Sequence, residues 1–157
     1  MKKISLSIII TVCLLLMIGA CVSEHNEKDM VPPTIEDSED CYPQQCQSFF
    51  RGEVIPVRCL FTDDNELGNY NIEVHNNFDH HTHSTVAGEC EMEEKKSPVN
   101  PWVYNKDYHI PEGQTAYQAN LEIPIPTDID TGNYHFVIRL TDATGWQQIK
   151  SVSISIK

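Results

Sequence analysis

The sequence predicts an all-β protein, an antiparallel β-sandwich with one long loop, preceded by a lipoprotein signal and a flexible tether. Three observations favour this fold class. Apolar residues alternate in several short stretches, turn-forming residues separate these stretches, and no convincing helix follows the N-terminal leader. Roughly 135 residues follow that leader, which is enough for one sandwich but not for two.

Residues 1–20 have the composition of a bacterial lipoprotein signal peptide. Two lysines precede an apolar run from Ile4 to Ile18 that is too short for a membrane span. The motif Ile18-Gly19-Ala20-Cys21 resembles a lipobox, in which the peptidase cuts before Cys21 and that thiol carries the lipid. The alternative is an ordinary secretory signal with a cysteine at the cut. A lipid anchor would attach the protein to a membrane without a spanning helix.

The chain is strongly acidic, with a formal net charge of −12 that becomes −14 once cleavage removes Lys2 and Lys3. Nucleic acids and anionic membrane surfaces bind clustered lysine and arginine, so this balance argues against both as partners. The same balance favours the attraction of cations.

Residues 21–31 form the predicted tether, because they are mostly polar and charged and bury too little apolar surface to fold. The folded domain is predicted to span residues 32–157. Pro32 and Pro33 mark its start, and residues 34–36 are expected to form a first edge strand.

Five longer strands follow from the alternation of apolar residues, which places every second side chain on the same face. In the strand that ends at His75, the even-numbered residues face the core and His75 faces outward. In the strand after Gly132, His135 likewise faces outward. The expected inward residues are Ile55, Val57, Cys59 and Phe61; Tyr70, Ile72 and Val74; Tyr117, Ala119, Leu121, Ile123 and Ile125; Tyr134, Phe136, Ile138 and Leu140; and Val152, Ile154 and Ile156.

No clear period extends from residue 76 to residue 109, and loops of this length are usually functional or disordered. Four of the seven histidines lie at its start or immediately before it: His75, His80, His81 and His83. Neutral imidazole is a good ligand for Zn²⁺ and Cu²⁺, so the cluster predicts a transition-metal site, with a pH sensor as the alternative. The acidic residues of the loop are expected to be solvated, although they could add oxygen ligands: Glu89, Glu91, Glu93 and Glu94.

Four cysteines remain once the leader and the lipidated residue are set aside. An even number in an oxidising compartment predicts two disulfides, with three possible pairings. We favour Cys41 with Cys46 and Cys59 with Cys90. A thiolate metal site is disfavoured, because no CxxC spacing is present.

Two further readings of the polar residues carry less weight. Residues 63–66 and Asp142 offer hard oxygen donors that suit Ca²⁺, but they lack the EF-hand spacing, and a turn-forming role is expected for them. For enzymatic chemistry, the sequence has no G-x-S-x-G, H-E-x-x-H, phosphate-binding loop or Rossmann glycine pattern, so we expect no catalysis.

Residues 52–55, 61–67, 70–75 and 77–83 resemble a family of small Bacteroidetes lipoproteins with an immunoglobulin-like domain of unknown function. The run Asn77-Phe78-Asp79-His80-His81-Thr82-His83 is the more specific motif of this resemblance. Residues 132–136 and 140–145 resemble the last hairpin of bacterial immunoglobulin-like and cadherin-like repeats. The resemblance implies an immunoglobulin-like sandwich on a cell-surface or periplasmic lipoprotein, and it implies no activity.

An immunoglobulin-like fold would make the strands that contain His75 and His135 antiparallel neighbours, with both histidines on the outer face. His81 and His83 would share a face in an extended loop, whereas His80 would point elsewhere and is a weaker candidate. The predicted metal ligands are therefore His75, His81, His83 and His135, with Asp79 as a fifth ligand or as an acceptor that orients an imidazole.

The resulting expectation is a non-catalytic outer-membrane lipoprotein that captures zinc or copper through its histidines and passes it to an outer-membrane transporter. The alternative is an adhesion or scaffold module in which any metal ion only fastens the long loop. Residues 22–23 do not resemble an inner-membrane retention signal, which favours the outer membrane, facing either the periplasm or the surface.

Overall fold

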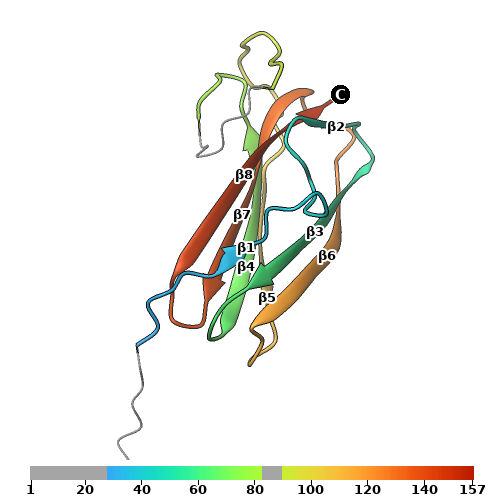
Figure 1. Ribbon diagram of the computed structural model, residues 1–157. Helices are drawn as coiled ribbons and strands as arrows, with labels where there is room; N and C mark the ends of the chain where they lie inside the picture. The colour runs from blue at the N-terminus through green and yellow to red at the C-terminus, as the bar shows by residue number, and fades with distance from the viewer. Residues whose placement is uncertain (1–27, 83–89) are drawn as a thin grey trace, which may run out of the picture.

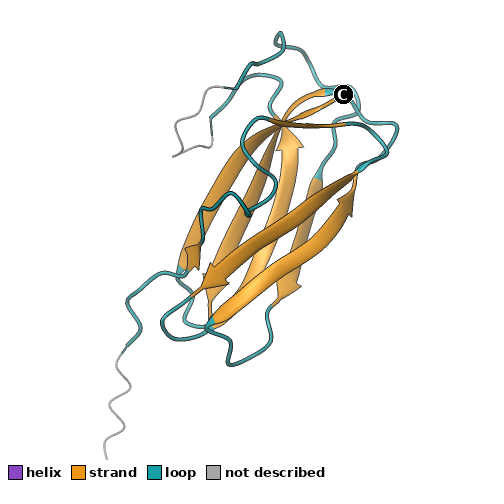
Figure 2. Cartoon of the chain, turned by 45° about the vertical axis from the view of Figure 1, so that its right-hand side comes forward, coloured by secondary structure: helices purple, strands orange, loops and turns teal. Residues whose placement is uncertain are grey.

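The computed structural model describes residues 28–82 and 90–157, which form two packed β-sheets (Figure 1, Figure 2). The all-β sandwich predicted from the sequence is confirmed. The smaller sheet has the order β1 (Thr34–Ile35), β3 (Val54–Thr62) and β6 (Ala116–Pro124). The larger sheet has the order β2 (Gln47–Phe49), β8 (Gln147–Ile156), β7 (Gly132–Asp142), β4 (Leu67–Asn76) and β5 (Tyr104–His109).

The distribution of the strands is that of an immunoglobulin-like sandwich, with β3 and β6 in one sheet and β4, β7 and β8 in the other. Tyr134, at the start of β7, donates a hydrogen bond from its hydroxyl to the carbonyl of Asp130 at 2.6 Å. This contact matches the tyrosine corner of such domains. One pair departs from the antiparallel expectation, because β2 runs parallel to β8.

The core lies between the sheets and follows the predicted parity. Ile55 and Val57 on β3 and Ile72 and Val74 on β4 are at most 1% exposed. Because side chains alternate along a strand, this burial turns the odd residues of β4 outward, His75 among them.

Two strands were not predicted, and neither has a strong apolar alternation. β2 is only three residues long and lies at the edge of its sheet. β5 is an exposed edge strand within the segment that the sequence leaves as loop. Its tyrosines, Tyr104 and Tyr108, are half-buried against the core, while the charged residues between them face solvent.

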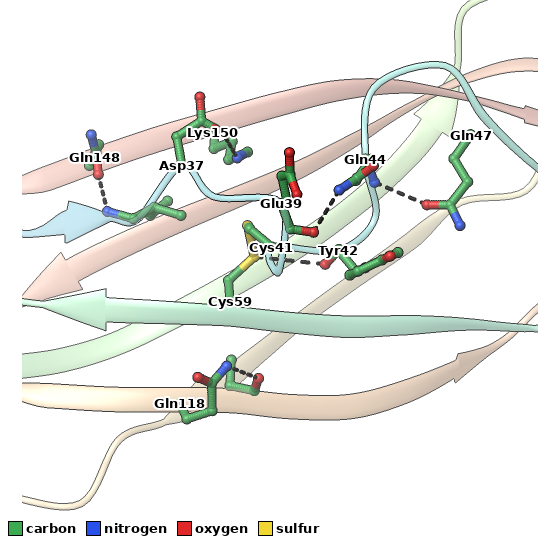
Figure 3. Close-up of a disulfide and its surroundings, with 12 residues drawn as sticks. Asp37, Glu39, Cys41, Tyr42, Gln44, Gln47, Cys59, Gln118, Gln148 and Lys150 are labelled. Carbon is green, nitrogen blue, oxygen red and sulfur yellow. Dashed lines mark hydrogen bonds and ion pairs between the residues drawn. A yellow bond between two sulfur atoms is a disulfide. The ribbon is translucent and has the colours of Figure 1, made fainter.

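The predicted pairing of the cysteines is wrong, although all four form disulfides. Cys41 is bonded to Cys59 on β3 (Figure 3), and Cys46 is bonded to Cys90. The backbone pairing of Tyr42 with Arg58 brings Cys41 beside the inward-facing Cys59. Cys46 is turned toward β8, where its amide donates to the carbonyl of Ser153. The short loop between Cys41 and Cys46 therefore joins two disulfides rather than closing one.

The long segment before β5 is fastened to the sandwich near the start of β7. The Asp130 carboxylate accepts hydrogen bonds from the amides of Val99 and Asn100 at 2.7 and 2.8 Å, and Trp102 is buried. Within the two described ranges, no helix is long and apolar enough to cross a membrane. The predicted signal, Cys21 and residues 21–27 of the tether lie outside those ranges.

Candidate metal centre

The ends of two neighbouring strands position the first two histidines. His75 near the end of β4 is the register partner of His135 near the start of β7, and their ring centroids are 5.5 Å apart. The predicted cross-strand pair is confirmed. His135 is nevertheless only 4% exposed, so its side of the sheet is covered rather than open to solvent.

The loop after β4 brings a third ring to this pair. The Asn77 amide donates to the carbonyl of Asn133 at 2.8 Å, and His80 adopts a left-handed conformation with φ of 61°. The chain then returns over the strands. The ring of His81 lies 5.5 Å from that of His75 and 5.1 Å from that of His135. Three imidazoles from two strands and one loop are therefore mutual neighbours.

Phe78 anchors this loop in the core. Its ring is 3% exposed and meets the ring of Tyr134 edge to face at 5.3 Å, while the Lys96 ammonium lies 4.6 Å above it. Gly132 makes room for the ring, because a Cβ atom there would lie 2.9 Å from Phe78. The anchor explains why the loop covers His135 rather than extending into solvent.

Oxygen atoms hold one nitrogen of each ring. Nδ1 of His81 lies 2.5 Å from the Asp79 carboxylate, Nδ1 of His75 lies 2.9 Å from the Glu73 carboxylate, and Nε2 of His135 donates to the His81 carbonyl at 3.0 Å. Metal-binding histidines bind the ion through one nitrogen while an oxygen orients the other. If the three rings bind an ion, these contacts favour Nε2 of His75 and of His81 and Nδ1 of His135 as the ligand atoms.

The contact with His81 also acts on its acidic partner. Its hydrogen bond to the Asp79 carboxylate is the main cause that holds the pKa of Asp79 below its usual value. Asp79 therefore stays ionised near neutral pH, and its carboxylate accepts a hydrogen bond from the imidazole N–H of His81. This contact fits one of the two roles predicted for Asp79, that of an acceptor that orients an imidazole.

Glu73 was missed by the sequence analysis. Its signal was present, because Glu73 lies two residues before His75 and so shares the outward face of β4. A carboxylate two residues from a strand histidine is within reach of the nearer ring nitrogen, and that is the contact the structure places here.

The other candidates are distributed differently. His80 turns to another segment, where its Nε2 donates to the carbonyl of Glu93 at 2.9 Å. His83 and Glu89 lie outside the described residues, so their predicted roles stay predictions. The remaining acidic candidates, Glu91, Glu93 and Glu94, are exposed.

A family model described as a domain of unknown function, DUF4625, matches residues 19–157. The chain belongs to this family. The DUF4625 match includes the histidine loop, both disulfides and Cys21 at the start of the predicted tether. A search of the curated proteins found no match. The DUF4625 description names no activity, so the arguments for function rest on the site itself.

Solvent access differs among the three histidines of this DUF4625 domain. The side chain of His75 is 19% exposed and that of His81 is 35% exposed, whereas His135 is buried. The site is thus closed toward the sheet and open toward the loop.

Proposed function

We propose that this protein is a membrane-anchored extracytoplasmic lipoprotein that binds Zn²⁺ or Cu²⁺ through His75, His81 and His135. The observation that carries the proposal is the mutual approach of these three rings at centroid distances of 5.1 to 5.5 Å. His83, two residues after His81, is the predicted fourth ligand.

The spacing of the rings supports one shared ion. A zinc ion lies about 2.0–2.1 Å from a histidine nitrogen, and tetrahedral geometry then separates the ring centroids of two ligands by roughly 5.2 Å. All three measured distances lie close to that value. Small rotations of the side chains would direct the assigned nitrogens at one ion. Imidazole donors favour zinc or copper over Mg²⁺ and Ca²⁺.

The accessible side of the site supports capture rather than catalysis. A hydrolytic zinc site needs a positioned general base, and the carboxylates of Asp79 and Glu73 contact His81 and His75 instead. Exposure of His81 suits an ion that is taken up and released, as a protein that supplies an outer-membrane transporter requires. The net charge of −12 would draw cations toward the molecule.

The burial of His135 supports a second function, in which the ion only fastens the loop on an adhesion or scaffold domain. The two functions predict different exchange rates. A captured ion should leave for a competing chelator within seconds to minutes, and a structural ion should be retained until the protein unfolds. Chelator competition on the zinc-loaded chain distinguishes them.

Calorimetric titration of the full chain with Zn²⁺ and Cu²⁺, without a histidine tag, tests the site. We expect one ion per chain, and a loss of affinity of about tenfold or more for His81→Ala and for His135→Ala. His109→Ala is the matched control, because His109 is exposed and pairs with Asn69 at the far end of β4. Unchanged affinity in both site variants, or an equal loss in the control, would contradict the proposal.

A further inference from the structure

Three aspartates meet at the other end of the sandwich, away from the histidines. Asp29 precedes β1, Asp63 follows β3, and Asp142 ends β7. Among the residues that the structure describes, one carboxylate oxygen from each lies within 4.8 Å of the other two. Figure 1 shows the chain entering β1 beside the β7–β8 turn, at the end opposite the loop after β4.

Each carboxylate uses one oxygen to shape its own turn. Oδ1 of Asp142 accepts hydrogen bonds from the amides of Thr144, Gly145 and Trp146 at 2.6 to 2.9 Å. Oδ1 of Asp63 accepts from the amide of Asn65 at 2.9 Å. The turn-forming role expected from the sequence is therefore present, and it uses only one of the two oxygens of each carboxylate.

The second oxygen of each aspartate has no such partner. Oδ2 of Asp29, of Asp63 and of Asp142 is buried and accepts no hydrogen bond from any described residue. The residue Asp142 itself is only 3% exposed. A buried carboxylate oxygen without a donor is costly, and one facing two further carboxylates is repelled as well.

The described surroundings contain no ion pair that offsets these charges. No lysine or arginine in the described ranges forms an ion pair with any of the three aspartates. Among the described residues, the three carboxylates therefore lie together without a cationic partner.

We propose that Asp29, Asp63 and Asp142 bind a calcium ion. All three donors are hard carboxylate oxygens, which favour calcium or magnesium. Zinc and copper, in contrast, are favoured by the imidazole nitrogens of the histidine site. Calcium lies about 2.3–2.6 Å from its ligands, so oxygens on opposite sides of the ion are separated by up to roughly 5 Å. The three aspartate oxygens lie within 4.8 Å of one another, so one such ion could contact all three. Mg²⁺ demands near-ideal octahedral geometry at about 2.0–2.1 Å and usually keeps several waters, whereas Ca²⁺ binds carboxylates in a flexible geometry.

Calcium at this position would join the N-terminal segment to two turns of the domain. Asp29 is the member that lies in the segment before β1, and its carbonyl accepts a hydrogen bond from the indole of Trp146 at 3.1 Å. Gly68 allows β4 to approach closely, because a Cβ atom there would lie 2.7 Å from the Asp142 carbonyl. The ion would therefore fasten the start of the domain to the β7–β8 hairpin.

The test is a titration of the full chain with CaCl₂, followed by calorimetry and by tryptophan fluorescence. We expect one calcium ion per chain, a change in tryptophan emission that Trp146→Phe abolishes, and a rise in melting temperature with calcium concentration. Asp29→Asn and Asp63→Asn should each weaken binding by about tenfold or more, because one charged ligand is lost. Circular dichroism of both variants without calcium checks that they fold. If Asp63→Asn does not fold, the calcium affinity of Asp29→Asn tests the proposal.

The matched control is Asp64→Asn, because Asp64 is exposed in the same turn and lies outside the cluster. Its calcium affinity should stay within about twofold of the parent chain. No binding by the parent chain, equal losses in Asp64→Asn and Asp29→Asn, or equal affinity for MgCl₂ would each overturn the proposal. His81→Ala should leave calcium binding unchanged, which separates this test from that of the histidine site.

Discussion

Tyr70 and Tyr108 stack across β4 and β5, with ring centroids 4.9 Å apart and planes 10° from parallel. Burial is the main cause that raises the pKa of each hydroxyl above its usual value. The hydrogen bond between the hydroxyls of Tyr104 and Tyr108, at 2.6 Å, adds to the rise for Tyr108. The edge strand is thus held by rings that resist ionisation.

Alkaline pH should therefore destabilise the fold through these two tyrosines. In the unfolded chain they ionise near pH 10, whereas in the folded chain they ionise at higher pH. Their contribution to stability is complete below about pH 10 and is lost as the pH rises through the folded value. When tyrosinate absorbance is followed as the pH rises, one fraction of the tyrosines should ionise only above about pH 10, and Tyr70→Phe and Tyr108→Phe should each reduce that fraction. If either variant instead reduces the fraction that ionises near pH 10, the pKa assignment is wrong.

The direction of side chains on long strands could be predicted at this scale. Alternation along β4 and β7 was enough to place His75 and His135 on one face, and their register is the predicted one. Asp29 could not be found in this way, because it lies in a polar segment without a period. Only the fold brings it to Asp63 and Asp142, residues far from it in the chain.

The loop after β4 is the element on which the histidine site depends. Phe78 inserts beside Gly132, whose φ of 125° and short approach to the ring leave no space for a side chain. The loop therefore holds His81 over β4 and β7 only while this contact is intact.

Gly132→Ala should destabilise the protein and loosen the histidine site. We expect a loss of at least about 2 kcal/mol in urea unfolding, from backbone strain and from the clash with Phe78. Gly113→Ala is the control, because Gly113 also has a positive φ, of 77°, but no atom within 4 Å of the added Cβ. It should lose only about 1 kcal/mol. Equal losses of stability in the two variants would show that the contact with Phe78 does not cause the destabilisation.

Other elements could not be predicted because long-range partners define them. β2 exists through three residue pairs with β8, and β5 through its contact with β4. The disulfides have the same origin, since Cys41 meets Cys59 through backbone pairing next to β3, and Cys90 lies 44 residues from Cys46. Sequence spacing favoured the shortest loop, and tertiary contacts selected the longer ones.

The whole molecule presents two candidate ion sites of different chemistry at opposite ends of one sandwich. The histidines lie where β4 ends and β7 begins, and the aspartates lie near the start of β4 and the end of β7. The same two strands run through both sites. No described residue belongs to both ligand sets.

Binding at the two ends should therefore be independent. The rise in melting temperature with Zn²⁺ and Ca²⁺ together should equal the sum of the separate rises, because distant sites without shared partners act additively. Zinc affinity should change by less than about twofold when calcium is added. Calorimetric titration with zinc, with and without calcium, measures this directly. A larger change would indicate that β4 or β7 transmits strain between the sites.

The place where the chain enters the sandwich also determines which end of the domain would face the membrane. A domain anchored through Cys21 would be held by its aspartate end, next to the entry at β1. The ten residues of β4 span roughly 30 Å at about 3.3 Å each, so the histidine loop would stand that much farther from the bilayer. The proposed calcium ion would then stabilise the end of the domain nearest the membrane, and the transition-metal site would lie at the end farthest from it.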